Sequence, residues 1–251
     1  MKKSAVKIND PWESLKEFTA ARIAMGRAGS SIPLTQYLEF KLAHAHARDA
    51  VYSELNSDAI SYYLRHLDLP ILKLHSKAEN RNQYLQRPDL GRLPSDQSVD
   101  IIKEHAGQYD ICIIIADGLS AHAVNSNAVQ LVECLLQVFN AVKYKLAPIG
   151  ITAQSRVALA DHIAHGLGAK LSIMLIGERP GLSSADSVGA YLTYNPKPGL
   201  TDESRNCVSN IRPEGLTHDL AAEKIFYLVR EAFKRKLSGV ELKDNAGLLT
   251  S

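Results

Sequence analysis

The sequence has few cysteines and no long apolar run, and both absences restrict its class. Only three cysteines occur in 251 residues, far apart and without the spacing of metal ligands, which suits a reducing cytoplasm. No apolar run approaches the roughly 20 residues that a membrane helix needs. The basic start, Met1–Ile8, lacks the apolar stretch of a secretory signal. We therefore expect a cytoplasmic protein without a membrane segment.

An excess of charge of either sign is also absent. The chain has 29 Lys and Arg residues against 27 Asp and Glu residues, so bulk electrostatics give no reason to expect nucleic-acid binding. What the chain does have is a hydrophobic fraction of 45%, which predicts a packed core. Its length is enough for one large or two modest domains.

The first third of the chain has helical spacing. Apolar residues three to four apart follow Asp10 and Pro11, a cap and a first helical proline, and predict a helix over residues 12–23. Residues 26–31 contain two glycines and end this helix. The composition shifts toward Pro, Gly and polar residues over residues 76–98, where we place a domain boundary. Two further helices are expected, over residues 35–53 and 57–67.

The remainder, residues 96–251, alternates between apolar strands and helices. Residues 110–116 and 171–176 are continuous apolar runs, which are typical of strands buried on both faces. The pattern predicts an α/β domain with a mostly parallel sheet and helices on both faces, after a helical extension and connecting segment over residues 1–95. The expected elements are strands at 110–116, 145–151, 171–176 and 189–194, and helices at 121–141, 157–167 and 220–236.

The familiar nucleotide-binding and hydrolase motifs are missing. Gly166 and Gly168 follow a predicted helix and precede a strand, which reverses the order of a dinucleotide fingerprint and favours a helix C-cap. No segment matches a phosphate-binding P-loop. Residues 118–120 resemble the nucleophile turn of a serine hydrolase but lack its second glycine, so Ser120 is interpreted as a helix N-cap.

Metal-ligand patterns are weak. His44 and His46 stand two residues apart on a predicted helix and point to different sides, so they cannot share a metal ion. Asp161 and His165 share a helix face, but such pairs are ordinary on solvated helices. We expect no metal site.

Three loops collect polar residues near predicted strand ends: residues 117–120, 177–184 and 205–215. In open α/β sheets, ligands bind outside the carboxyl ends of the strands. The loops offer freed glycine backbone and polar side chains, which suit a ligand rich in amides and hydroxyls. The polar side chains are Asp117, Glu178, Arg179, Arg205, Asn206 and Asn210. Cys207 lies in the third loop, where its thiol is compatible with a functional role or with simple packing. The turn at residues 26–31 can bind an anion through its backbone or dock on a partner.

Beyond this physical reading, the sequence resembles the small (light) subunit of ethanolamine ammonia-lyase, an adenosylcobalamin-dependent enzyme. The matching stretches occur in order and extend from about residue 12 to about residue 244. They are Phe18–Gly29, His44–Ala50, Leu74–Ser76, Tyr84–Arg92, Ile115–Ser120, Ser155–Leu159, Leu175–Ser183, Arg205–Gly215 and Lys236–Gly239.

The resemblance implies a Rossmann-like domain that completes the cobalamin site at an interface with a large subunit. The large subunit would bind ethanolamine and carry the catalytic residues, and the products would be acetaldehyde and ammonia. Three cobalamin contacts carry over to Val157, Glu178 and Cys207. Val157 would offer apolar contact, Glu178 would accept hydrogen bonds from corrin amides or nucleotide hydroxyls, and Cys207 would contribute packing or a backbone group.

A second type of cobalamin protein uses a D-x-H-x-x-G motif whose histidine binds cobalt. The segment Asp161–Gly166 is a near match, but the histidine position is Ile163, so the nucleotide base should stay on cobalt. Some members of the family are directed into a bacterial microcompartment by a longer N-terminal region; residues 1–11 leave this open beside a free cytoplasmic enzyme. The alternative function is a non-catalytic cofactor-binding or scaffold protein of the same fold.

Overall fold

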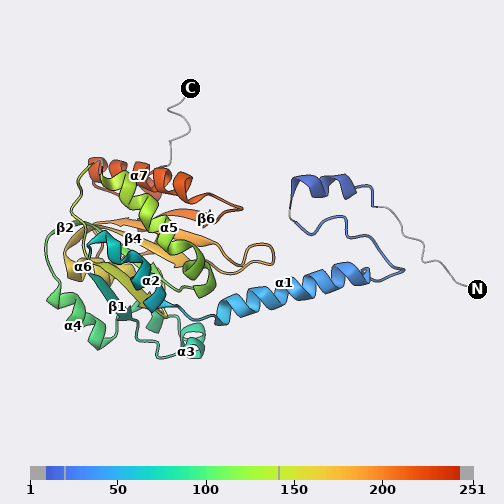
Figure 1. Cartoon of the computed structure of the whole chain (residues 1–251), viewed down its shortest axis with the longest axis horizontal. Coiled ribbons are helices and arrows are strands. Elements are labelled where there is room, and N and C mark those ends of the chain that lie inside the picture. Colours follow the sequence, from blue (N-terminus) through green and yellow to red (C-terminus); the bar gives the residue numbers. More distant parts are fainter. Residues whose placement is uncertain (1–9, 20, 141, 244–251) are drawn as a thin grey trace, which may run out of the picture.

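The computed structural model describes residues 10–19, 21–140 and 142–243. A six-stranded sheet lies at its centre, in the order β1-β3-β2-β4-β5-β6 (Figure 1). The first four strands in this order are parallel, and β5 and β6 add to one edge in antiparallel pairing, so the expected mostly parallel sheet is confirmed. The strands are β1 Ile71–His75, β2 Tyr109–Ala116, β3 Ile149–Ala153, β4 Ala169–Gly177, β5 Val188–Tyr194 and β6 Asn206–Ile211.

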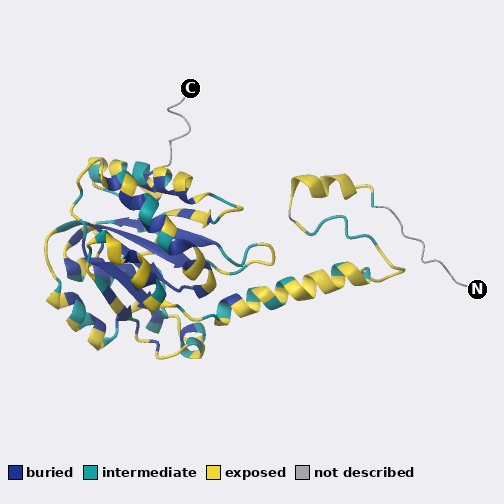
Figure 2. Ribbon diagram, in the orientation of Figure 1, coloured by how far each residue is buried: buried dark blue, intermediate teal, exposed yellow. Residues whose placement is uncertain are grey.

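Helices cover both faces of this sheet, which explains the continuous apolar runs. In β2, Ile113 packs into one core and Ile114 into the other, since neighbouring side chains of a strand point to opposite faces. The first core includes residues of α2, α5 and α7, and the second includes residues of α4 and α6. Figure 2 shows the buried sheet between these layers. The helices are α1 Leu34–Tyr52, α2 Ser57–Leu64, α3 Arg81–Gln86, α4 Asp96–Glu104, α5 Ala121–Asn140, α6 Leu159–Leu167 and α7 His218–Arg235.

Polar residues at the helix ends act as the sequence suggests. Ser120 accepts a hydrogen bond from the backbone N–H of Ala123, at 3.2 Å, and confirms the predicted N-cap of α5. Gly168 ends α6 with a φ of +80°, and a Cβ there would lie 2.2 Å from the Gly107 carbonyl oxygen. This position requires glycine for its backbone, which confirms the predicted C-cap.

Two expectations from the sequence are wrong, and one strand was missed. Within the described part of residues 12–23, a short 3-10 helix at Glu13–Phe18 replaces the expected α-helix, and none of its residues is buried. β1 was not expected. Residues 206–210, expected as a loop, belong to edge strand β6, in which Val208 and Ile211 are the buried side chains. An edge strand leaves most of its side chains in water, so its sequence is as polar as that of a loop.

The segment before α2 extends away from the layered body, and we call it the N-terminal arm (residues 10–52) and the rest the body (residues 53–243). Figure 1 shows α1 leaving the body, with the first described turn beyond it. The sheet takes its first strand from residues 71–75, so it draws on chain before residue 96. A division into domains at residue 95 stays a prediction. Among the described residues, no helix has the length and apolarity required to cross a bilayer.

Candidate functional site

An open cleft of about 440 Å³ lies at the carboxyl ends of the central parallel strands. The helices that follow β2 and β3 cover opposite faces of the sheet, so their first turns diverge and leave a crevice, as expected for an α/β sheet. The residues that line it come from the ends of β2, β3, β4 and β5 and from α3. They are Tyr84, Gly118, Leu119, Arg156, Val157, Ile176, Gly177, Glu178, Arg179 and Tyr191.

A buried carboxylate connects the two sides of the crevice. Asp117, at the end of β2, accepts hydrogen bonds from the backbone N–H groups of Gly118, Gln154 and Ser155 at 2.9, 2.7 and 3.0 Å. Burial raises the pKa of Asp117, and these N–H groups together with Arg81 oppose that shift. Gln154 is held at a φ of +55°, a costly conformation for a residue other than glycine. Asp117 therefore fixes the loop that carries Val157.

Two glycines let the loops at the ends of β2 and β4 touch. A Cβ on Gly118 would lie 2.3 Å from the Gly177 carbonyl oxygen, and one on Gly177 would lie 2.0 Å from the Ser120 carbonyl oxygen. The backbone N–H of Leu119 instead donates to the Gly177 carbonyl at 2.9 Å. The cleft floor depends on this close approach of two backbones.

A buried aromatic ring with two arginines forms one wall. The guanidinium carbons of Arg81 and Arg156 lie 4.7 and 4.2 Å from the ring centroid of Tyr84, and the Tyr84 hydroxyl donates to the Ser155 carbonyl at 3.0 Å. Burial raises the pKa of Tyr84, so the phenol stays protonated. Nε of Arg156 and Nη2 of Arg81 are buried and have no hydrogen-bond partner within the described part of the chain. Of the two arginines, Arg156 lines the cleft, so its Nε is the donor available to a bound group.

Val157 lies between β3 and α6 and is half-buried at the cleft. Its inner side packs against the apolar core beneath the sheet. The side that faces the cleft gives an apolar contact surface beside the Arg156 guanidinium. The structure therefore brings this sequence-predicted residue to the strand-end cleft.

Glu178 is the first residue after β4, and a hydrogen bond from the backbone of β6 orients its carboxylate. Its Oε2 accepts a hydrogen bond from the backbone N–H of Asn210 at 3.2 Å. The missing side chain of Gly189 leaves room for it, because a Cβ there would lie 3.0 Å from Oε1. Glu178 and Val157 thus line the same cleft although 21 residues separate them in the sequence.

Cys207 lies at the rim of this cleft rather than in its lining. It is an exposed residue of β6, directly opposite Tyr191 of β5, which does line the cleft. Although the residue as a whole is exposed, burial of its thiol against the protein raises the pKa of Cys207; a hydrogen bond with Tyr191 opposes this shift, and the nearby Glu178 carboxylate adds to it. Burial, followed by Cys207 and Glu178, raises the pKa of Tyr191. Both groups are therefore protonated at neutral pH, and neither is an activated nucleophile.

Other polar residues of the three loops have structural partners. The guanidinium Nη1 of Arg205 lies 2.7 Å from Oδ1 of Asp161, and both side chains are almost completely buried. Asn206 bonds to the backbone of Gly239 and Leu242. Arg205 and Asn206 were expected to face a ligand, and the structure contradicts this because their polar atoms are used inside the fold. No group of three potential metal ligands occurs among the residues described here.

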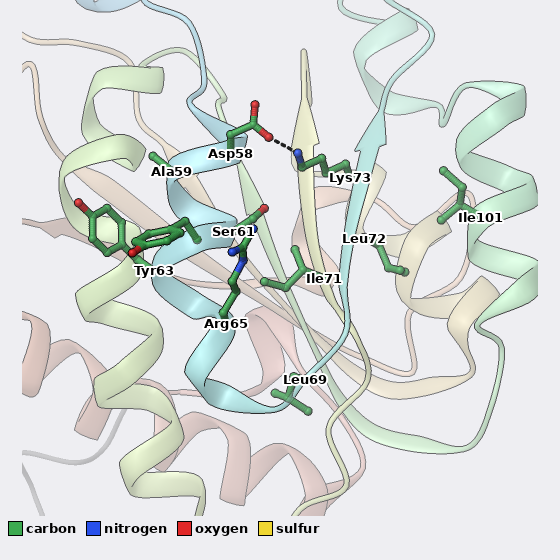
Figure 3. Close-up of a pocket in the computed structure, with 11 residues that line it drawn as sticks. Asp58, Ala59, Ser61, Tyr63, Arg65, Leu69, Ile71, Leu72, Lys73 and Ile101 are labelled. Carbon is green, nitrogen blue, oxygen red and sulfur yellow. Dashed lines mark hydrogen bonds and ion pairs between the residues drawn. The ribbon is translucent and has the colours of Figure 1, made fainter.

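A second hollow, of about 1,010 Å³, lies along the edge strand β1 (Figure 3). Asp58 of α2 and Lys73 of β1 form an ion pair across it. Ser98 bonds to both backbone groups of His75 and so closes one end of the strand edge. A charged lysine and a short strand are how proteins protect an open sheet edge. We therefore assign the candidate site to the strand-end cleft.

Sequence analysis pointed to Val157 and Glu178 but gave no role to Arg81, Tyr84 and Arg156. The only signal for Tyr84 was its place in a stretch that resembles the family. The two arginines stand 75 residues apart, and only the fold brings both onto the same ring. No local pattern could have found this wall of the cleft.

Comparison with known proteins identifies the family. The family model described as ethanolamine ammonia-lyase light chain matches residues 9–243. The chain is 51% identical over 241 residues to the ethanolamine ammonia-lyase small subunit of Azotobacter vinelandii, which covers 94% of this chain and 89% of that protein. It is 50% identical over 254 residues to the small subunit of Pseudomonas fluorescens strain Pf0-1, covering 100% and 93%. The chain therefore belongs to the ethanolamine ammonia-lyase small-subunit family.

Proposed function

We propose that this chain completes the adenosylcobalamin site of an ethanolamine ammonia-lyase, together with a large subunit that carries the catalytic residues. In this family the cofactor, when bound, supplies the radical chemistry that converts ethanolamine to acetaldehyde and ammonia. The observation that carries the proposal is the meeting of Val157 and Glu178 in one open cleft at the strand ends. Cys207 lies next to this cleft, opposite Tyr191.

The chemistry of the cleft fits such a cofactor. Corrin side chains end in amides, which both donate and accept hydrogen bonds. In the cleft lining, Arg156 offers a buried donor without a partner among the described residues, and Glu178 offers carboxylate oxygens. Val157 and Leu119 add apolar surface. The set supports binding and orientation of a large amide-rich ligand.

The size of the cleft supports a shared site. About 440 Å³ is within the range of a drug-sized pocket, and a corrin with its nucleotide tail is several times larger than a drug. This chain would hold one part of the cofactor, and a partner subunit would cover the rest. Glu178, Val157 and Arg156 would orient the part they touch and keep water from it.

No acid–base or nucleophilic role is proposed for these residues. Asn210 engages the Glu178 carboxylate, and the raised pKa values of Cys207 and Tyr191 keep their protons in place. The cleft therefore supplies contacts, and a mechanism centred on this chain alone lacks a nucleophile and base.

Co-expression tests the proposal. The chain alone should have no ethanolamine activity, and the chain with a large subunit and adenosylcobalamin should release acetaldehyde and ammonia. Adenosylcobalamin binding to the assembled complex, followed by its visible absorbance, should require this chain. A complex that assembles and binds the cofactor without turnover would favour the alternative, a non-catalytic cofactor-binding or scaffold protein.

Location forms the last part of the proposal. We propose a cytoplasmic enzyme, either free or within a bacterial microcompartment. Residues 1–11 are the segment at issue, and residues 1–9 lie outside the described part of the chain. A fluorescent fusion of the full chain, expressed with and without shell proteins, separates diffuse from punctate enzyme.

A further inference from the structure

The N-terminal arm exposes an unusual share of the large apolar side chains. Of the seventeen such side chains exposed in the described part of the chain, ten lie in residues 12–52, including Trp12, Phe18 and Leu34 at 64%, 83% and 69% exposure. Contiguous exposed apolar surface of this kind marks an interaction site on a soluble protein. The arm makes up only a fifth of the chain, so the concentration is specific to it.

The distribution of apolar residues on α1 shows what type of partner is needed. Leu34, Leu38 and Leu42 follow one helical stripe with Tyr37 beside it, but Phe40 lies on the opposite side, and within this helix only Ala50 is buried. A helix that is apolar on more than one side is normally buried from several sides. At 19 residues it is about 28 Å long. Within the described part of the chain, no residue of α1 other than Ala50 is covered to the point of burial, so we expect another molecule to cover the helix.

Area and charge narrow the partner to an apolar protein surface. Ten large side chains carry on the order of 150–250 Å² each, and at their exposed fractions they present on the order of 1,000 Å². A standard protein interface needs about 800 Å² from each partner. Lys41 and Arg48 are balanced by Glu39 and Asp49 on α1, so the helix lacks the basic face of a helix that lies on anionic lipid.

The arm also touches the loop that carries Glu178. We call residues 178–187, between β4 and β5, the cleft loop. Nη2 of Arg22 donates to the carbonyl of Leu182 in this loop at 3.2 Å. A hollow of about 370 Å³ lies between α1, at Leu42 and His46, and residues 181–185. The arm is therefore continuous with one side of the candidate cofactor site.

The cleft loop is held on its other side by the body. Ser120 Oγ donates to the Ala185 carbonyl at 2.8 Å, and Asn127 Nδ2 donates to the Asp186 carbonyl at 2.9 Å. Nη1 of Arg212 lies 3.2 Å from Oδ1 of Asp186. Nη1 of Arg212 also donates to the Ser183 carbonyl at 3.5 Å, so the body holds residues 183–186, whereas Leu182 contacts the arm. Movement of the arm thus acts on the loop at Leu182, four residues from Glu178.

We propose that the N-terminal arm is the surface on which the large subunit docks, and that docking there orders the cleft loop for the cofactor. This inference rests on the proposed function, because it takes the large subunit as the partner. Its matching surface is apolar, so the complex should resist salt. Subunit assembly and cofactor binding are then coupled through Arg22 and Leu182.

The docking surface is tested on the full chain with purified large subunit. Leu38→Glu and Leu42→Glu should each weaken the complex by about tenfold or more, measured by calorimetry or sedimentation. Leu220→Glu on α7, equally exposed at 53%, is the matched control and should change the affinity less than about threefold. Equal losses in all three variants, or none in the arm variants, would overturn the proposal. These sites are exposed, so folding should be unchanged, which circular dichroism verifies.

The coupling is tested by hydrogen exchange and by cofactor binding. In the wild-type complex, amides of residues 181–185 should exchange more slowly than in the free chain. In Arg22→Ala, the complex should still form, but these amides should stay fast and cobalamin affinity should fall by about tenfold. If exchange in the loop is the same in both complexes, the coupling is wrong.

Two outcomes separate this inference from the proposed function. A wild-type chain that does not bind the large subunit at all would count against the proposed function. A chain that binds it and the cofactor while the arm keeps the exchange rate of the free chain counts only against the docking surface. Self-association lost in Leu38→Glu would instead show a second copy as the occupant, and association with anionic vesicles a membrane; both overturn the proposal.

Discussion

The N-terminal arm and the body of this chain contain similar apolar residue types but bury them to very different extents. In β2, every residue from Ile111 to Ala116 is buried between two helical layers, whereas α1 buries only Ala50. The body therefore closes its cores with its own residues. The arm has the composition of an element that is covered by another molecule. Four changes test this difference, beginning with the one of largest expected effect.

Loss of one partner of the buried Arg205–Asp161 ion pair should damage the body most. Arg205→Met should lower the free energy of unfolding by about 3–5 kcal/mol, because Asp161 then remains buried without its partner. Urea unfolding measures it. Lys170→Met, which breaks the exposed pair with Asp110, is the control and should cost less than about 1 kcal/mol. Equal losses in the free energy of unfolding would mean that the buried ion pair matters no more to stability than the exposed one.

A pair of apolar truncations compares body and arm directly. Ile115→Ala should cost about 2–5 kcal/mol, because it opens a cavity in a fully buried strand. Leu38→Ala, at 56% exposure, should change the stability of the free chain by no more than about 0.5 kcal/mol. Both are read from urea unfolding of the chain without partner. A large loss for Leu38→Ala would show that the arm already packs on the body in solution.

The Glu178 carboxylate tests whether the cleft of the body binds the cofactor. Glu178→Ala should weaken adenosylcobalamin binding to the assembled enzyme by about 1–3 kcal/mol, the scale for loss of one polar partner. A titration followed by visible absorbance measures it. Glu223→Ala, which removes an exposed carboxylate on α7 outside the cleft lining, is the control. Unchanged affinity for Glu178→Ala would remove this residue from the site.

The smallest effect concerns pH and His218, at the start of α7. Burial lowers the pKa of His218, and its Nε2 contacts Oδ1 of Asn127 at 2.9 Å. A depressed histidine pKa means that the folded state favours the neutral ring. Its stability contribution is therefore complete above the ordinary pKa near 6.5 and declines as the pH falls through 6.5 toward the folded value. Thermal unfolding of wild type should drop between about pH 7.5 and pH 5.5, and His218→Gln should drop less. An identical drop in both would refute this role.

The sequence alone located the elements with dense apolar patterns to within about two residues. This holds for β2, β4, α5 and α7, whose long apolar runs or stripes define both type and extent. β1 and β6 escaped prediction because they are short edge strands with few buried side chains. The predicted helix at residues 12–23 failed because the described part of the chain buries none of the residues at Glu13–Phe18, and a short helix without packing is marginal.

For the candidate site, the strand-end rule led to the correct edge of the sheet, and family resemblance selected Val157 and Glu178. The structure adds the stacked Arg81, Tyr84 and Arg156, whose buried donors have no signature in local sequence. The structure also shows that Arg205 does not face a ligand, because its guanidinium pairs with the buried Asp161. Asp161 lies 44 residues earlier, on α6, so no local pattern indicates this pair.

What the sequence by itself determined is which residues lie inside and which family the chain belongs to, because burial follows from local periodicity and identity from matched segments. Only the tertiary structure decided which segments meet: the order of the strands, the cleft shared by β2, β3 and β4, and the contact of the arm with the cleft loop. The physical reason is that local spacing sets the face of a helix or strand, whereas contacts between distant segments depend on how all the faces pack together.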